Sequence, residues 1–216
     1  ATLALGLKHL GAKVGLLDAD IYGPSVPTLF DVHQPLDMVE RDGKQWMIPI
    51  EKYGIKLLSI GFVTAPGQAV VWRGPMISSA FRQFINDADW GELDYLIVDL
   101  PPGTSDVQIT LAQLAPLTGV VVVTTPQEMA LTDARRAIDM FSLGSIAKPI
   151  IGVVENMSFF SPEDAPEKKY HIFGEGGGRN LAQQYELPFL GELPLNPSVG
   201  KSADTGVWDF HQTQMQ

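Results

Sequence analysis

The sequence predicts an α/β fold: a three-layer arrangement in which a mostly parallel sheet carries helices on both faces. Two observations support this prediction. Short apolar runs typical of buried parallel strands alternate along the chain with segments of helical composition. Polar residues follow directly after several of these runs, at the position where open α/β sheets bind ligands. The length of 216 residues suits one medium-sized domain, so we expect a single domain over residues 1–216.

The expected elements follow from hydrophobic patterning and from helix-ending residues. The chain opens in a helix that ends before Gly11, a typical C-cap residue. This helix has no start signal, so we expect a strand and a turn before it. Residues 22–67 are interrupted by prolines and are expected to be irregular apart from one strand. The expected strands cover 13–18, 56–60, 95–99, 119–124, 150–154 and 189–193, and the expected helices cover 1–10, 76–86, 107–114, 131–143 and 178–185.

Composition excludes several classes of function. The chain has 25 acidic and 15 basic residues and a net charge of −10, which argues against a nucleic-acid-binding surface. Its apolar runs are too short to cross a bilayer, and no presequence is visible. We therefore expect neither nucleic acid nor membrane as a partner. The chain has no cysteine, which excludes disulfides and thiolate metal sites formed by these residues.

Acidic residues follow two of the predicted strands. Asp18 and Asp20 leave the first strand two residues apart, where they can hold a cation or an attacking water; capping of a turn explains them equally well. Asp99 ends the apolar run 95–99, as in the Walker-B arrangement, whose carboxylate holds the magnesium shell of a nucleotide. Two prolines then stiffen the turn, and Gly103 allows a backbone N–H to approach a phosphate.

An amide residue follows a third strand. Asn156 comes after the run 150–154 and can offer both a donor and an acceptor to the edge of an adenine ring. Taken alone, a role as a turn-forming residue is the better explanation.

Several segments together resemble a known family. GLLDADIYGPSVP, VVWRGPM, DWGELDYLIVDLPPGTSDVQ, TTPQEMALTDARRA, VVENMS, HIFGEGGG and LGELPL are similar, in order, to successive blocks of the Mrp/ApbC family. That family belongs to the deviant-Walker-A P-loop ATPases, with MinD, ParA and the nitrogenase iron protein as relatives. The resemblance covers essentially all 216 residues.

The resemblance implies roles at the phosphate end of a bound ATP. Asp20 would orient or activate the attacking water, and Asp18 would lie near the magnesium ion. Asp99 would bind Mg²⁺ through water, and Gly103 would sense the γ-phosphate. Asp20 and Asp99 are thus the expected catalytic residues.

At the base end, the resemblance implies that Asn156 reads adenine and that the backbone near Pro194 and Leu195 completes the pocket. The function implied is that of an ATP-hydrolysing iron–sulfur cluster carrier, a cytoplasmic homodimer that delivers clusters to apoproteins; an organelle is left open as the location. A positioning or partition ATPase of the MinD/ParA kind and a non-catalytic interaction module are the alternatives.

The chain departs from the family pattern in two places. The Gly-Lys-rich phosphate-binding loop that precedes the first helix in the family is absent, so we expect truncation at the N-terminus, and also at the C-terminus, and no ATP hydrolysis by these residues alone. Many members also carry Cys-x-x-Cys after the Asn-Met-Ser block, where two subunits share a four-iron cluster. Residues 157–166 contain no cysteine, so no iron–sulfur ligand is identified.

Overall fold

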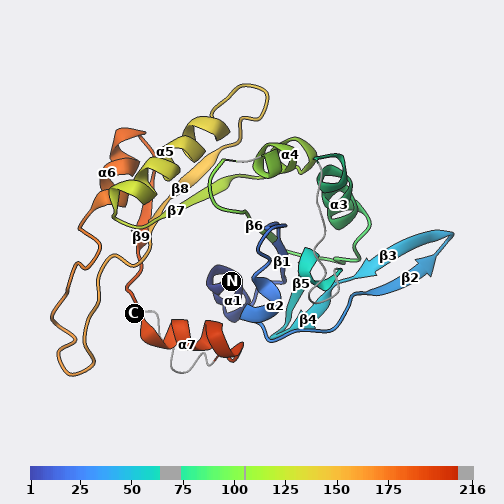
Figure 1. Ribbon diagram of the computed structural model, residues 1–216, viewed down its shortest axis with the longest axis horizontal. Helices are drawn as coiled ribbons and strands as arrows, with labels where there is room; N and C mark the ends of the chain where they lie inside the picture. The colour runs from blue at the N-terminus through green and yellow to red at the C-terminus, as the bar shows by residue number, and fades with distance from the viewer. Residues whose placement is uncertain (64–73, 105, 209–216) are drawn as a thin grey trace. The chain divides into compact units, whose positions relative to one another are not determined.

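The computed structural model describes residues 1–63, 74–104 and 106–208 (Figure 1). The chain divides into two compact units. Unit 1 comprises Ala1–Pro101, Asp106–Leu114 and Ser198–Gln216, and unit 2 comprises Pro102–Ser105 and Ala115–Pro197. The expectation of a single domain over 1–216 stays a prediction. Most of the VVWRG segment lies outside the described residues.

Unit 1 is built on a mostly parallel sheet with strand order β4-β5-β1-β6 (Figure 1). The central strand β1 (Val14–Asp18) pairs in parallel with β5 (Ile55–Ser59) on one side and β6 (Tyr95–Asp99) on the other. The short strand β4 (Ile50–Lys52) is antiparallel to β5. All five residues of β1 are buried, which explains why this strand is a continuous apolar run ending in a single acid.

One face of this sheet is covered by α1 (Thr2–His9) and α2 (Val26–Leu29). Leu16 of β1 and Leu57 of β5 point into the core that these helices share. Helix α1 ends as predicted, with Gly11 at a φ of 95° just beyond its last turn.

The other face is covered by α3 (Gly74–Asn86) and α4 (Asp106–Leu114). Leu17 and Leu58, the neighbours in sequence of the residues on the first face, pack here against the fully buried Phe81. Because successive strand residues point to opposite faces, both faces of the parallel sheet are apolar. Unit 1 therefore has the predicted three layers.

A hairpin occupies part of the segment that we expected to be irregular. Strands β2 (Asp37–Arg41) and β3 (Lys44–Ile48) are antiparallel and joined by Asp42 and Gly43, whose φ angles are 53° and 74°. Two positive φ angles in a two-residue loop match the twist of a hairpin, and Asp-Gly is the usual sequence for it. The prediction for residues 22–67 was wrong here, since the Asp-Gly signal was present.

Three helical segments also lay outside the prediction. They are α2 and the 3₁₀ turn η1 (Ile60–Phe62), both within residues 22–67, and α7 (Pro197–Thr205), which opens with proline, a residue favoured in the first turn. Beyond α7, the indole N–H of Trp208 donates to the backbone oxygen of Leu29 at 2.7 Å. This bond ties the segment after α7 to the core of unit 1.

Unit 2 contains a parallel sheet of order β7-β8-β9, formed by β7 (Val120–Thr124), β8 (Ile150–Glu155) and β9 (Phe189–Glu192) (Figure 1). Helices α5 (Glu128–Phe141) and α6 (Gly177–Gln184) pack on one face of this sheet. Each of the predicted strands and helices is found within three residues of its expected ends.

The two faces of the β7-β8-β9 sheet differ in exposure. Val122 and Val153 are buried against α5 and α6, whereas Val123 and Ile151 are exposed. Within the part of the chain that the structure describes, no helix has the length and apolar character needed to span a membrane.

Removal of a buried aromatic ring tests the core of unit 1. Phe81→Ala is expected to lower the free energy of unfolding by about 3–5 kcal/mol, because it removes a fully buried side chain between α3 and the sheet. Trp46, Trp90 and Trp208 belong to unit 1, so urea unfolding followed by tryptophan fluorescence measures the effect. The control is Leu10→Ala at a site that is 83% exposed, with an expected change within about 0.5 kcal/mol.

Candidate functional site at the carboxyl ends of the strands

Two carboxylates lie at adjacent strand ends in unit 1. The parallel register places Asp18 of β1 opposite Asp99 of β6 and opposite Ser59 of β5. Neighbouring strands are about 4.8 Å apart, so these side chains share one edge of the sheet. The two acids differ in exposure: Asp18 is 2% exposed, whereas the Asp99 side chain is 49% exposed.

Hydrogen bonds from four groups hold the Asp18 carboxylate. Its Oδ2 accepts from the Ser59 hydroxyl at 2.9 Å and from the backbone N–H groups of Ser25 and Val26 at 3.0 Å each. Its Oδ1 accepts from the backbone N–H of Asp20 at 3.2 Å. Asp18 therefore fixes the whole turn from β1 to the start of α2.

Burial raises the pKa of Asp18 above its ordinary value of 3.8, because the ionised form loses its hydration. The hydrogen bonds from the Val26 N–H, the Ser59 hydroxyl and the Asp20 N–H oppose this shift, and the charge of Asp99 adds to it. Burial is the largest of these effects.

Asp20 folds back onto its own turn. Its Oδ1 accepts from the N–H of Tyr22 at 3.1 Å and from that of Gly23 at 3.0 Å. This is the Asx-turn geometry that aspartate favours. Turn capping, left open by the sequence, is thus observed for both Asp18 and Asp20, and a catalytic role for Asp20 stays a prediction.

Asp99 lies beside the start of α1. Its carboxylate is 3.7 Å from the backbone nitrogen of Ala1, and its backbone oxygen accepts from the N–H of Ala19 at 2.9 Å. The half-exposed carboxylate is a hard oxygen donor of the type that Mg²⁺ prefers, so the residues at this edge fit a magnesium ion. No group of three or more potential metal ligands occurs among the residues that the structure describes.

Gly103 has a left-handed backbone conformation, with a φ of 80°. A Cβ there would meet no atom within 4 Å, so the conformation, and not a lack of space, is what favours glycine. Its predicted contact with a phosphate stays a prediction.

In unit 2, Asn156 follows β8 directly. Its N–H donates to the backbone oxygen of Thr124 at 2.7 Å, and its Oδ1 accepts from the N–H of Met157 at 3.0 Å. Met157 has a φ of 55°, so the chain turns sharply after the strand. The amide that was predicted to read adenine is thus fixed at a strand end.

The segment predicted to complete the base pocket lies beside the turn that follows Asn156. The N–H of Ser158 donates to the oxygen of Leu193 at 3.0 Å, and the N–H of Leu195 donates to the oxygen of Phe159 at 2.7 Å. Pro194, between these two bonds, is exposed. Within unit 2, the structure therefore places the residues predicted for the base end near one another. Within unit 1, it separately places Asp18, Asp20 and Asp99 near one another.

Two buried polar residues at these strand ends were not predicted as site residues from the sequence. Ser59 is fully buried and bonds Asp18, and Glu155 is 1% exposed and bonds the N–H of Gly178. In both cases the available signal was a polar residue at the last position of an apolar run.

A hollow of about 440 Å³ lies elsewhere in unit 2, at the amino end of β8. None of the predicted site residues lines it. Its walls are formed by Phe141, Ser142, Ala147, Lys148, Pro149, Ile150 and Leu187.

Comparison with known proteins gives consistent results. Residues 1–216 match the sequence profile of the family described as ParA: NUBPL iron-transfer P-loop NTPase. An iron–sulfur cluster carrier protein of Deinococcus radiodurans is 54% identical over 205 residues, which cover 95% of this chain and 57% of that protein. The chain thus spans little more than half the length of this relative.

Solved structures show the same likeness. A nucleotide-binding protein of Archaeoglobus fulgidus, in complex with ADP, is 35% identical with a TM-score of 0.78, covering 94% of this chain and 78% of that one. The cell-division ATPase MinD of Pyrococcus furiosus has a TM-score of 0.64 at 16% identity, covering 99% of this chain and 85% of that one. The second likeness shows the fold alone.

The raised pKa of Asp18 predicts a pH dependence of stability. The folded state binds the Asp18 proton more tightly than the unfolded state, so the contribution of this group is present below its ordinary pKa and is lost as pH rises through the raised pKa. The free energy of unfolding of the wild type, minus that of Asp18→Asn, is expected to fall from about pH 4 to about pH 7. Urea titrations across this range measure it, and a difference that grows with pH contradicts the assignment.

Proposed function

The chain belongs to the ParA-type family of NUBPL iron-transfer P-loop NTPases, and on this basis we propose that the protein binds and hydrolyses ATP and delivers iron–sulfur clusters to apoproteins. The observation that carries the proposal is the placement of Asp18, Asp20 and Asp99 at one carboxyl edge of a parallel sheet. Ligands of open α/β sheets bind at this edge.

Each acid has a role that fits its surroundings. Asp99, half exposed, holds the water shell of Mg²⁺, and Asp18, buried in hydrogen bonds, keeps the adjoining turn rigid. Asp20 orients the attacking water through its carboxylate, which the turn holds in place. Magnesium, when bound, offsets the charge that develops on the transferring phosphoryl group.

The remaining contacts are made by backbone groups and by one amide. We assign the backbone N–H at Gly103 to the γ-phosphate, and we assign Asn156 to the adenine base beside Pro194 and Leu195. The phosphates also need a cradle of backbone N–H groups. No Gly-Lys-rich loop occurs in these 216 residues, so we expect ATP turnover only in the full-length protein.

The iron–sulfur cluster is the cargo in this proposal. The 216 residues contain no cysteine, and serine or carboxylate oxygens are poor ligands for such clusters. We therefore assign no ligand of the four-iron cluster to these residues, and we propose that the carrier is a homodimer. The proposed location is the cytoplasm, with an organelle as the alternative; fractionation of the source cells tests it.

Substitution of the two acids separates their roles in the full-length protein. Asp99→Ala is expected to lower magnesium-dependent kcat by about 10²–10³-fold, because the metal loses its protein anchor. Asp20→Ala is expected to lower kcat by about 10²-fold while the Kd for ATP stays within about threefold. Steady-state ATPase assays and nucleotide titrations measure both effects.

The control for these variants is Asp133→Asn, which changes an exposed acid of α5 whose carboxylate pairs with Arg136. Its turnover is expected to equal that of the wild type. Equal activity in all four proteins would refute the site assignment.

Cluster reconstitution tests the carrier role. The full-length protein, treated anaerobically with iron, sulfide and reductant, is expected to bind a cluster as a dimer and to transfer it to an apo-ferredoxin. Absorbance and mass measurements of both proteins follow the transfer. A dimer that binds ATP but no iron, and that instead sediments with liposomes or DNA when ATP is added, would replace the carrier role with that of a positioning ATPase.

A further inference from the structure

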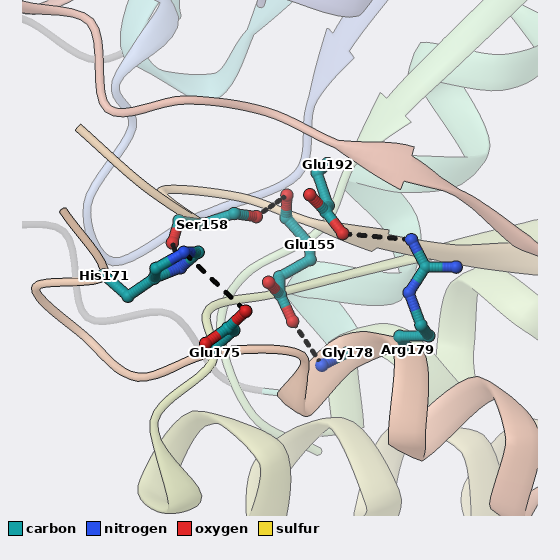
Figure 2. A network of polar contacts seen from close by, with 7 residues as sticks. All are labelled: Glu155, Ser158, His171, Glu175, Gly178, Arg179 and Glu192. Atoms are coloured by element: carbon teal, nitrogen blue, oxygen red, sulfur yellow. Dashed lines mark hydrogen bonds and ion pairs between the residues drawn. The ribbon is translucent and has the colours of Figure 1, made fainter. Parts of the chain in front are cut away.

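Glu155 is a buried acid with an unusual position. It is the last residue of β8, directly before Asn156, and its side chain is 1% exposed. A buried carboxylate destabilises the fold unless hydrogen bonds satisfy it. Its Oε2 accepts from the N–H of Gly178, in the first turn of α6, at 2.5 Å (Figure 2).

The carboxylate of Glu155 serves as the cap of α6. The residue before this helix, Gly176, has a left-handed conformation and offers no side-chain cap. A negative charge at a helix N-terminus is stabilising, and its hydrogen bonds to backbone N–H groups are among the strong ones. The cap of α6 is thus supplied by a neighbouring strand.

The glycines of this segment allow the close approach. A Cβ on Gly178 would lie 3.0 Å from the Cβ of Glu155 and 3.2 Å from its Oε2. A Cβ on Gly177 would lie 2.6 Å from the backbone oxygen of Pro126. The glycines of HIFGEGGG thus let α6 approach the end of β8 closely.

The backbone oxygen of Glu155 makes a second set of contacts. It accepts from the hydroxyl of Ser158 at 3.0 Å and from the N–H of Leu193 at 2.8 Å. Ser158 follows Asn156 by two residues, and Leu193 precedes Pro194. Both sides of the proposed base pocket are therefore attached to one residue.

The same network reaches the loop before α6. A ring nitrogen of His171 lies 3.2 Å from the backbone oxygen of Ser158, and the other lies 3.8 Å from the carboxylate of Glu175 (Figure 2). The loop, the first turn of α6 and the end of β8 thus form one connected set of contacts within unit 2.

We propose that Glu155 is a positioning residue for the nucleotide base: it holds Asn156 and the 193–195 backbone in place by anchoring the end of β8 to α6. This inference rests on the proposed ATP-binding function and adds a residue that touches neither base nor phosphate. It also links occupancy of the base pocket to the 171–178 segment, because both depend on the same anchor.

The test is Glu155→Gln in the full-length protein. The amide has the size of the carboxylate but lacks its charge, so the bond to Gly178 is weakened and Asn156 loses its fixed position. We expect KM for ATP to rise about tenfold while kcat stays within about twofold, and the preference for ATP over GTP to fall by a similar factor.

The matched control is Glu192→Gln. Glu192 is the register partner of Glu155 on β9 and pairs with Arg179, the residue after Gly178, but its side chain is 33% exposed. KM and base preference are expected to remain those of the wild type. Equal KM and base preference in Glu155→Gln and the wild type, or the same loss in both variants, would overturn the inference.

A milder pair of variants keeps the test valid if Glu155→Gln folds poorly. Ser158→Ala removes the hydroxyl that bonds the Glu155 oxygen and is expected to raise KM about threefold, whereas Ser158→Thr keeps the hydroxyl and is expected to restore it. If the threonine variant fails to restore KM, the positioning role is rejected.

Hydrogen exchange separates failure of this inference from failure of the proposed function. In Glu155→Gln, the N–H groups of Ser158, Leu193 and Leu195 are expected to exchange at least about tenfold faster than in the wild type, with or without nucleotide. Unchanged exchange rejects the anchor. A wild type that binds no ATP rejects the proposed function and the base-positioning role with it, whereas an active wild type with normal Glu155 variants rejects only the inference.

Discussion

The parallel pairing of β1 with β5 and β6 is the constraint on which the site in unit 1 depends. It sets Asp18 between Ser59 and Asp99 at one edge of the sheet. Two carboxylates at neighbouring strand ends repel each other, and burial makes the charge of Asp18 more costly still. Four donors offset this cost on the buried side, and a cation would offset it on the exposed side. The proposed magnesium ion would therefore relieve a repulsion that the strand pairing imposes.

Asp18 and Glu155 make the same kind of contact in the two units. Each is a buried acid at the last position of a parallel strand, and each accepts a hydrogen bond from a backbone N–H at the start of the helix that packs beside the strand. The charge-assisted hydrogen bond links the end of the strand to the start of the helix, and this link restricts the positions of the residues just after the strand. Asp20 and Asn156 occupy those positions. In both units, the buried acid holds the residue to which we assign a contact with the ligand.

The parallel strands and most helices could be predicted, because parallel strands covered by helices are continuous apolar runs, such as those of β1 and β8. The β2–β3 hairpin was not predicted because the prolines around it indicated irregular structure, although its Asp-Gly turn favours a hairpin. For the site, the sequence identified the acids but not their burial. Ser59 bonds Asp18 because β5 lies next to β1 in the sheet. The order of the strands depends on tertiary packing, and a local sequence pattern does not reveal it. Glu155 was missed for the same reason.

The contacts of Asn156 also restrict how it can recognise a base. Its Oδ1 already accepts from the N–H of Met157, and this bond holds the side chain against its own turn. A carbonyl oxygen has two lone pairs, so in the proposed complex the second would accept from the exocyclic amino group of adenine, and the amide N–H₂ would donate to a ring nitrogen. Guanine presents an oxygen and a protonated nitrogen at the corresponding positions, which would place an acceptor against an acceptor and a donor against a donor. Discrimination between the bases therefore requires that Asn156 not rotate, and the Met157 contact together with the Glu155 anchor opposes that rotation.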